Sequence, residues 1–143
     1  MYLIDGYNLL YQTDFETRDE LMAGVGDFCR RKNKRAKIVF DGYSPEDLSN
    51  EVLEIVFVGD ADAELESLIK HVENPNNFVL VSSDKELIFY AQKKGVLVVR
   101  SEHFATIMKA EDSIEMPEKA DEVNLSDAEV KKQLEELNNF KKI

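Results

Sequence analysis

Met1-Tyr-Leu-Ile-Asp5-Gly-Tyr-Asn8 is the stretch of sequence that decides the fold. Its first residues are apolar without alternation, which is typical of a strand that is buried on both faces of a parallel sheet. An acid, a glycine and an asparagine follow directly, so the strand is expected to end at a turn that carries polar side chains. We therefore predict a short buried strand over residues 1–5.

Further apolar runs of the same kind follow along the chain and alternate with helical patterns. We expect strands at residues 38–40, 52–58, 78–81 and 96–99. Helices are expected from the capping box at Thr17 to about residue 32, over 61–72, from the capping box at Ser83 to about residue 94, and, as a short helix, from Ser101. This order predicts an α/β, doubly wound fold, with a mostly parallel sheet of about five strands and helices on both faces.

Length and composition indicate one globular domain with an acidic tail. The chain has 143 residues, of which 43% are hydrophobic and 33% are charged, and this length suits one core rather than two. We assign residues 1–109 to the α/β domain and residues 110–143 to an acidic linker and a C-terminal helix that begins near Ser126. That last helix is equally compatible with packing on the domain and with binding a partner.

Several classes of protein are excluded by the composition. No apolar run approaches the roughly 20 residues that a membrane helix needs. The first residues do not resemble an export signal, and the single cysteine, Cys29, cannot form a disulfide within the chain. We therefore expect a cytoplasmic protein that does not enter a membrane.

The charge of the chain is acidic and unevenly distributed. It has 18 Lys and Arg against 29 Asp and Glu, and the net charge of −11 repels a polyanion on average. The basic segment, residues 30–37, contains no acid. Two interpretations of it are equally compatible, a solvated helix end and a surface that binds RNA phosphates through Arg30, Arg31, Lys34 and Arg35.

Acidic side chains follow four of the expected strands, at the point where each strand ends. They are Asp5, Asp41, the pair Asp60 and Asp62, and Asp84. Because ligands of an open parallel sheet bind outside the carboxyl ends of its strands, we expect these acids to meet at one edge. Their repulsion is costly unless a cation neutralises it, and hard divalent ions such as Mg²⁺ prefer oxygen ligands of this kind.

An alternative interpretation is that these acids cap helices. Asp and Ser at a strand-to-helix turn are common N-caps, and Asp60 fits this role best. Glu66 lies one helical turn after Asp62, so both side chains can face the acidic edge. Asn8 fits two roles equally well, an Asx-turn and a group that orients a metal-bound water or holds a phosphate.

The same residues resemble the YacP-like branch of the NYN nucleases, within the PIN-like superfamily. The resemblance runs in order over about residues 1–108 and rests on Ile4-Asp-Gly-Tyr-Asn8, Val39-Phe-Asp-Gly42, Ala61-Asp62 with Glu66, Ser82-Ser-Asp84 and Ser101-Glu-His-Phe104. It implies a three-layer PIN-like fold and a metal-dependent endoribonuclease with an acidic pocket. The branch includes a ribosome-associated messenger-RNA nuclease of bacteria.

Carried onto this chain, the resemblance implies a set of site residues. The metal ligands would be Asp5, Asp62 and Asp84, with Asp41 close behind, and the catalytic residues would be Asp5, Asn8, Asp62 and Asp84, supported by Glu66 and Ser83. The implied cofactor is Mg²⁺ or Mn²⁺, which lowers the pKa of a bound water and stabilises charge on the phosphoryl oxygens during hydrolysis of an RNA phosphodiester bond.

Single-stranded messenger RNA is the expected substrate. Tyr7 and Tyr43 are candidates for stacking on its bases, and packing beside a turn explains them as well. The acidic balance favours a structured partner such as the ribosome over loose binding to any RNA. The main alternative is a non-catalytic RNA- or ribosome-binding module with the same fold. A phosphotransfer enzyme is disfavoured because no Asp-x-Asp pair ends the first strand, and the sequence does not indicate an oligomeric state.

Overall fold

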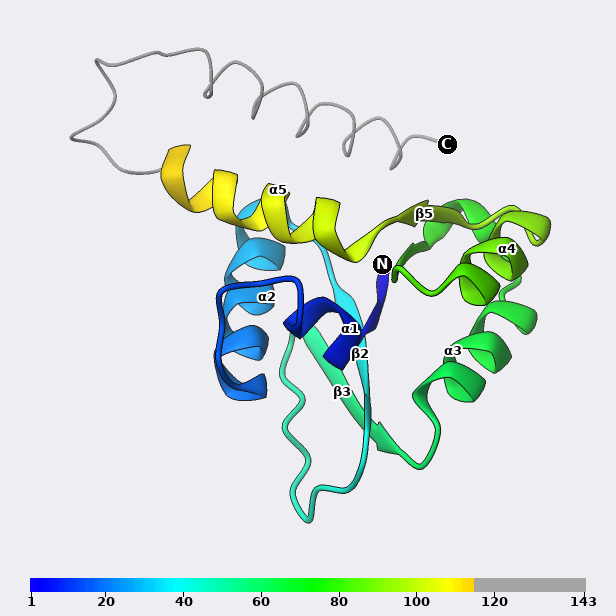
Figure 1. Cartoon of the computed structure of the whole chain (residues 1–143), viewed down its shortest axis with the longest axis horizontal. Coiled ribbons are helices and arrows are strands. Elements are labelled where there is room, and N and C mark those ends of the chain that lie inside the picture. The colour runs from blue at the N-terminus through cyan, green and yellow to red at the C-terminus, as the bar shows by residue number, and fades with distance from the viewer. Residues whose placement is uncertain (115–143) are drawn as a thin grey trace.

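A five-stranded parallel sheet forms the centre of the molecule (Figure 1). The structure is a computed structural model and describes residues 1–114. The strands are β1 (Tyr2–Asp5), β2 (Ala36–Asp41), β3 (Leu53–Val58), β4 (Val79–Val81) and β5 (Leu97–Val99), in the order β3-β2-β1-β4-β5. Every neighbouring pair is parallel, which confirms the sheet expected from the apolar runs.

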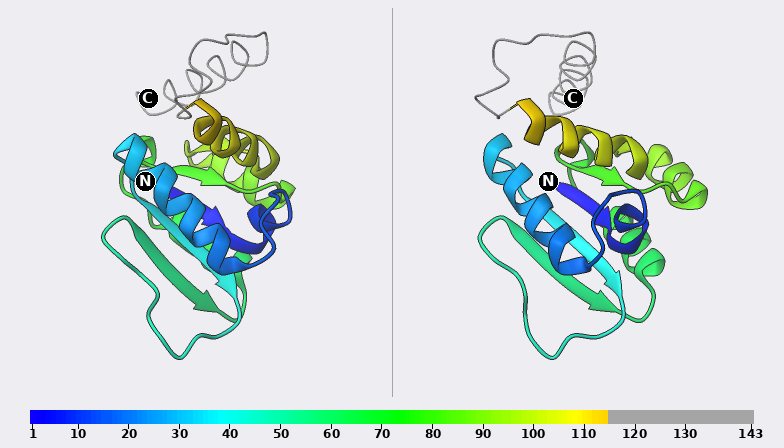
Figure 2. Two further views of the ribbon diagram at one scale, coloured as in Figure 1. Left: turned by 90° about the vertical axis from the view of Figure 1, so that its left-hand side faces the viewer. Right: turned by 60° about the vertical axis from the view of Figure 1, so that its left-hand side comes forward.

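Helices cover both faces of this sheet (Figure 2). They are α1 (Gly6–Leu10), α2 (Arg18–Lys32), α3 (Ala61–Lys70), α4 (Lys85–Lys93) and α5 (Ser101–Ile114), with a 3-10 helix, η1, at Pro75–Asn77. One core packs α1, α2 and α5 against the face that carries Ile4 and Phe40. The other packs α3 and α4 against the face that carries Leu3 and Val39. The three expected layers follow because alternate residues of a buried strand point to opposite faces.

The direction in which strands are added reverses next to β1. The chain moves from β1 outward to β2 and β3, and then returns to place β4 and β5 on the other side of β1. Open α/β sheets bind ligands at such a switch point, outside the carboxyl ends of the strands. β1 ends at Asp5, and the turn after β4 contains Ser82 and Asp84. The fold therefore brings these segments, far apart in the sequence, to the switch point.

β2 starts earlier than expected. A lysine belongs to this strand, because its charge is paired with an acid on the neighbouring strand. β2 begins at Ala36 rather than at residue 38, and it includes Lys37. The Nζ of Lys37 lies 2.8 Å from Oε2 of Glu54 on the neighbouring strand, where an ion pair replaces the solvent contacts of the ammonium group. The short helix α1 is not expected from the sequence, because five residues are too few to show a helical period.

The helix that begins at Ser101 is longer than expected. It has 14 residues and ends at Ile114, so residues 110–114 are helical instead of forming the start of a linker. The remainder of the expected acidic linker and the expected helix near Ser126 lie outside the described residues. Within residues 1–114, no helix combines the length and the apolar character needed to cross a membrane.

Gly6 shows how tightly the end of β1 is packed. A Cβ at this position would lie 2.5 Å from Cδ1 of Phe40. The Phe40 ring is fully buried and contacts the rings of Tyr7 and Phe57, so it has no room to retreat. A glycine is therefore required where the chain turns from β1 into α1.

We predict that Gly6→Ala lowers the free energy of unfolding by about 1–3 kcal/mol, because overpacking must displace the Phe40 ring or α1. Urea denaturation followed by circular dichroism measures the change. Gly26→Ala is the matched control, since its Cβ would lie 3.4 Å from Leu53, an ordinary contact, and alanine is favoured over glycine inside a helix. The prediction fails if the two variants unfold at the same urea concentration.

Candidate active site

Asp5 is a buried carboxylate at the end of β1. Its residue is 8% exposed, and Oδ2 accepts a hydrogen bond from Oγ of Ser82 at 3.3 Å. Within the described residues, no cation forms an ion pair with Asp5. The pKa of Asp5 is raised from 3.8 to about 6, first by burial and then by the carboxylates of Asp62, Asp41 and Asp84, while the Ser82 hydrogen bond lowers it. The fold therefore holds a carboxylate where its charge is costly.

Asp41 and Asp62 both lie at this edge, because the end of β2 is hydrogen-bonded to the start of α3. Oδ1 of Asp41, the last residue of β2, accepts a hydrogen bond from the backbone N–H of Ala61 at 2.7 Å. Asp62 is the next residue of α3, and its pKa is raised by partial burial and by neighbouring acids, of which Asp84 contributes most. The carboxylates of Asp41, Asp62 and Asp84 are close enough to Asp5 to act on its pKa, and we call these four acids the carboxylate cluster.

Two acids at this edge are also helix caps. Oδ1 of Asp60 accepts from the N–H of Ala63 at 3.1 Å, which confirms the capping role expected for it. Oδ1 of Asp84 accepts from the N–H groups of Glu86 and Leu87 at 2.9 and 3.0 Å. The cap of α4 is thus Asp84, and the capping box expected from Ser83 is wrong by one residue.

Glu66 shares a groove with two members of the carboxylate cluster. The groove runs between α3 and α4, has a volume of about 350 Å³, and is lined by Asp62, Glu66 and Asp84 among others. Asp62 and Glu66 lie on one side of α3, as their spacing predicts. The role of Glu66 as a supporting group stays a prediction.

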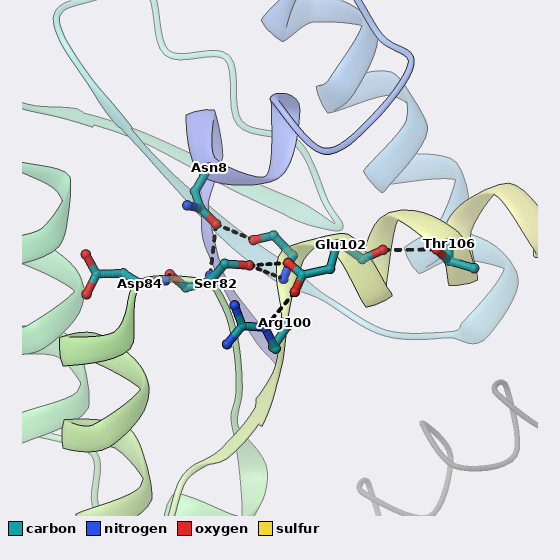
Figure 3. A network of polar contacts seen from close by, with 8 residues as sticks. Asn8, Ser82, Asp84, Arg100, Glu102 and Thr106 are labelled. Carbon is teal, nitrogen blue, oxygen red and sulfur yellow. Dashed lines mark hydrogen bonds and ion pairs between the residues drawn. The ribbon is translucent and has the colours of Figure 1, made fainter.

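Asn8 joins three segments of the chain (Figure 3). Its Oδ1 accepts hydrogen bonds from the backbone N–H of Ser83 at 2.9 Å and from Oγ of Ser101 at 2.5 Å. Because a backbone N–H only donates, this oxygen must face Ser83, and the Nδ2 group is left to donate elsewhere. Asn8 therefore fixes the turn after β4 and the start of α5 against α1.

Ser83 is held in this network and does not contact Asp5. Its Oγ donates to Oε2 of Glu102 and accepts from the N–H of Ser101. Glu102 also accepts from Nε of Arg100 at 2.6 Å, and these two hydrogen bonds lower the pKa of its carboxyl to about 2. Figure 3 shows Asp84 pointing away from these contacts. Ser83 and Glu102 thus stabilise the turn that presents Asp84.

Ser82, Ser101 and Glu102 are site residues that sequence reasoning did not select. The Oγ of Ser82 donates to Asp5 and accepts from the N–H of Asp84 at 3.1 Å, so it couples two members of the carboxylate cluster. Ser82, Ser101 and Glu102 all belong to two motifs that the sequence shows, Ser82-Ser-Asp84 and Ser101-Glu-His-Phe104. Sequence alone does not show which of two adjacent serines faces inward, because that depends on the path of the turn.

The basic segment lies at the opposite end of the sheet from the carboxylate cluster. It follows the end of α2 and enters the start of β2, whereas the cluster lies where the strands end. A six-residue strand separates the two ends by roughly 17 Å. Arg30 is also engaged, since it lies 3.6 Å from Asp27 and 3.5 Å from Glu51. Binding of RNA by this segment stays a prediction.

The two aromatic candidates have different surroundings. Tyr7 is half-buried, and its ring lies 5.0 Å from that of Phe40 in an edge-to-face contact. This contact agrees with the interpretation that Tyr7 packs beside the turn. Tyr43 is 79% exposed on the loop after β2. Stacking of either residue on an RNA base stays a prediction.

The donor set of the carboxylate cluster fits a hard divalent cation. All its ligating atoms are oxygens, which hard divalent cations prefer. In Asp41 and Asp84, Oδ1 accepts a hydrogen bond from a backbone N–H, so Oδ2 is the atom that could bind an ion. Asp5 carries a charge that no protein cation in residues 1–114 offsets. In that part of the chain, no group of three or more acidic, His or Cys side chains forms a ready-made metal site. Ion binding would therefore require side chains of the carboxylate cluster to move closer together.

Comparisons with known proteins agree with this architecture. The family model of the YacP-like NYN domain matches residues 2–143. The crystal structure of Rae1 (YacP) from Bacillus subtilis is similar over 99% of this chain and 92% of that chain, with a TM-score of 0.67 and 20% identity. A mutant form of that protein is similar over 92% of this chain and 90% of its own, with a TM-score of 0.63 and 21% identity. At these identities the likeness shows a shared fold. No curated protein matches the chain.

The raised pKa of Asp5 predicts a specific dependence of stability on pH. Its value of about 6 in the folded protein exceeds the ordinary 3.8, so the folded state binds the proton more tightly than the unfolded state does. The resulting stabilisation is complete below pH 4 and is lost as the pH rises through 6. Relative to wild type, Asp5→Asn should gain up to about 3 kcal/mol of unfolding free energy between pH 4 and pH 7.

Urea denaturation in EDTA at a series of pH values measures this difference. Asp60→Asn removes an exposed acid at the same edge and is the matched control, because asparagine caps a helix as well as aspartate does. If the difference in unfolding free energy between wild type and Asp5→Asn does not change with pH, the fold does not disfavour the charged form of Asp5.

Proposed function

This chain belongs to the YacP-like NYN domain family, and from that premise we propose that it is a metal-dependent endoribonuclease. The observation that carries the proposal is the carboxylate cluster at the switch point of the sheet, with the buried Asp5 at its centre. A protein gains no stability from assembling four acids in this way. Perturbed carboxylates in such a position are typical of a functional site.

The proposed ligands of Mg²⁺ or Mn²⁺ are Asp5, Asp62 and Asp84, with Asp41 beside them. When bound, the ion supplies a more acidic water and stabilises charge on the phosphoryl oxygens. Asp41 holds the first turn of α3 through the N–H of Ala61, and so sets where Asp62 lies. Ser82 sets the separation of Asp5 and Asp84 by bonding both.

Asn8 supports this chemistry as a positioning group. Its Oδ1 is engaged by Ser83 and Ser101, so it keeps the turn that presents Asp84 in place. Its Nδ2 has no hydrogen-bond partner among residues 1–114 and is suited to donate to a phosphate oxygen. The structure favours these two tasks over an Asx-turn, because the contacts of Oδ1 reach distant segments.

We predict that the protein cleaves single-stranded RNA in Mg²⁺ or Mn²⁺, and that Asp84→Asn lowers the rate by about 100-fold or more, since the metal contributes several kcal/mol to such reactions. Asparagine still caps α4, so the variant should fold. Cleavage of an end-labelled oligonucleotide, resolved on a gel, measures the rate. Asp60→Asn, the matched control, removes the same charge from a helix cap outside the carboxylate cluster and should cleave normally.

Two results would count against this proposal. Cleavage that continues in EDTA would exclude metal dependence, and undiminished cleavage by folded Asp84→Asn would exclude the assigned ligands. RNA binding without any cleavage by the wild type would instead favour the non-catalytic RNA- or ribosome-binding module.

We further propose that messenger RNA reaches the site on a ribosome. The net charge of −11 opposes loose binding of free RNA, so a structured partner that presents the strand would offset this repulsion. We predict that the protein co-sediments with ribosomes at low salt and is released as the salt concentration rises. Absence of the protein from the ribosome pellet at low salt would contradict this proposal and leave cleavage of free RNA untouched.

A further inference from the structure

Arg18 places a cation at the same edge of the sheet as the carboxylate cluster. It is the first residue of α2, and α2 runs back to the start of β2, so its first turn lies at the carboxyl ends of the strands. The Cζ of Arg18 lies 4.8 Å from the centroid of the Phe57 ring. Phe57 pairs with Phe40, the residue before Asp41. Arg18 is therefore next to the end of the strand that carries Asp41.

Among the described residues, no ion pair accounts for the cation of Arg18 at this position. The helix dipole disfavours positive charge in the first turn of α2. Within residues 1–114, the guanidinium of Arg18 has no hydrogen bond or ion pair, in contrast to that of Arg30, which contacts Asp27 and Glu51. The guanidinium of Arg18 rests over a ring, so its orientation is restrained while its N–H groups remain able to bind an anion.

An aromatic row leads from Arg18 to the surface beside α1. The rings of Phe57 and Phe40 are stacked at 5.4 Å, Phe40 meets Tyr7 at 5.0 Å, and Tyr7 stacks on Tyr11 at 6.3 Å with an interplanar angle of 25°. Tyr11 is 78% exposed, although it is a large aromatic side chain. The aromatic row, defined as Tyr11, Tyr7, Phe40 and Phe57, thus ends in an exposed ring at one side and in Arg18 at the other.

Two glycines lie at the edge of the sheet that separates the carboxylate cluster from the aromatic row. The two surfaces lie on opposite sides of the sheet edge, because Asp5 and Asp41 alternate with Ile4 and Phe40 along their strands. Gly42 follows β2 and Gly59 follows β3, and a Cβ at either glycine would meet no atom of residues 1–114 within 4 Å. A polymer can therefore cross this edge without displacing a side chain at those positions.

We propose that an RNA strand bound at the carboxylate cluster crosses this edge, places a phosphate on Arg18 and stacks a base on Tyr11. This inference rests on the proposed function and names how the substrate is held. The carboxylate cluster repels phosphates, and the guanidinium of Arg18 nearby offsets that repulsion. A guanidinium binds a phosphate with two parallel hydrogen bonds, and an exposed aromatic ring accepts any base. Arg18 and Tyr11 are thus RNA-binding residues, while the basic segment at the far end of the sheet is not required.

Binding of a fluorescein-labelled single-stranded RNA oligonucleotide to the full chain tests this path by fluorescence anisotropy in EDTA, where cleavage does not interfere. We expect Arg18→Ala to raise the Kd about tenfold and to reduce the slope of log Kd against log salt by about 0.7, the value for one phosphate contact on a single strand. Tyr11→Ala should raise the Kd by about tenfold without changing the slope, and Tyr11→Phe should bind as the wild type does.

Lys70→Ala is the control for loss of one positive charge, because Lys70 is exposed at the end of α3, away from the strand ends. Its Kd and salt slope should equal those of the wild type. The thermal midpoint of each variant shows that it is folded. A purely structural role of Arg18 would alter that midpoint and leave the salt slope unchanged.

Three results overturn the proposed path. They are an unchanged Kd and slope in Arg18→Ala, a loss of slope in Arg30→Ala instead, and an equal loss in Lys70→Ala. If Asp84→Asn abolishes cleavage while Arg18→Ala binds normally, the path fails and the proposed nuclease function remains. If neither the wild type nor any variant cleaves RNA, but RNA binding depends on Arg18 and Tyr11 as described, the path is supported and the proposed nuclease function fails.

Discussion

The arrangement of the acidic edge depends on the side-chain oxygen of Asn8. It accepts one hydrogen bond from Ser83 and one from Ser101, and so joins three segments that are far apart in the sequence. Ser82 and Asp84 flank Ser83, so their positions beside Asp5 follow from the same contact. A buried polar group that loses its partner costs about 1–3 kcal/mol, and this penalty makes the junction a strong restraint on the turn after β4.

This restraint works against electrostatic repulsion. Asp5 is buried without a cation to offset its charge in the described part of the chain, and its neighbours in the carboxylate cluster raise its pKa further. Packing supplies the free energy that holds these acids together, through Gly6 against Phe40 and through the two cores on either face of the sheet. An acidic site kept in this state is prepared for a divalent cation, whose binding would relieve the repulsion.

Much of the fold and part of the candidate site could be predicted from local sequence. The buried strands are visible because their residues are apolar without alternation, and the caps Thr17 and Asp60 are visible because capping depends on residues within one helical turn. The acids at the strand ends could be predicted to meet because parallel strands end at one edge. The inward-facing Ser82 and the contacts of Glu102 could not be predicted, since they depend on the path of a turn against α1 and α5.

The sequence by itself determined the order of the strands and of the longer helices, the acids at the strand ends and the position of the basic segment along the chain. Those properties are local, and short-range patterns of polarity and capping specify them. Only the tertiary structure decided that the basic segment lies at the far end of the sheet, and that Arg18 lies over Phe57 beside the acidic edge. The physical reason is that a crossover helix runs antiparallel to its strands, so its first and last turns meet opposite ends of the sheet.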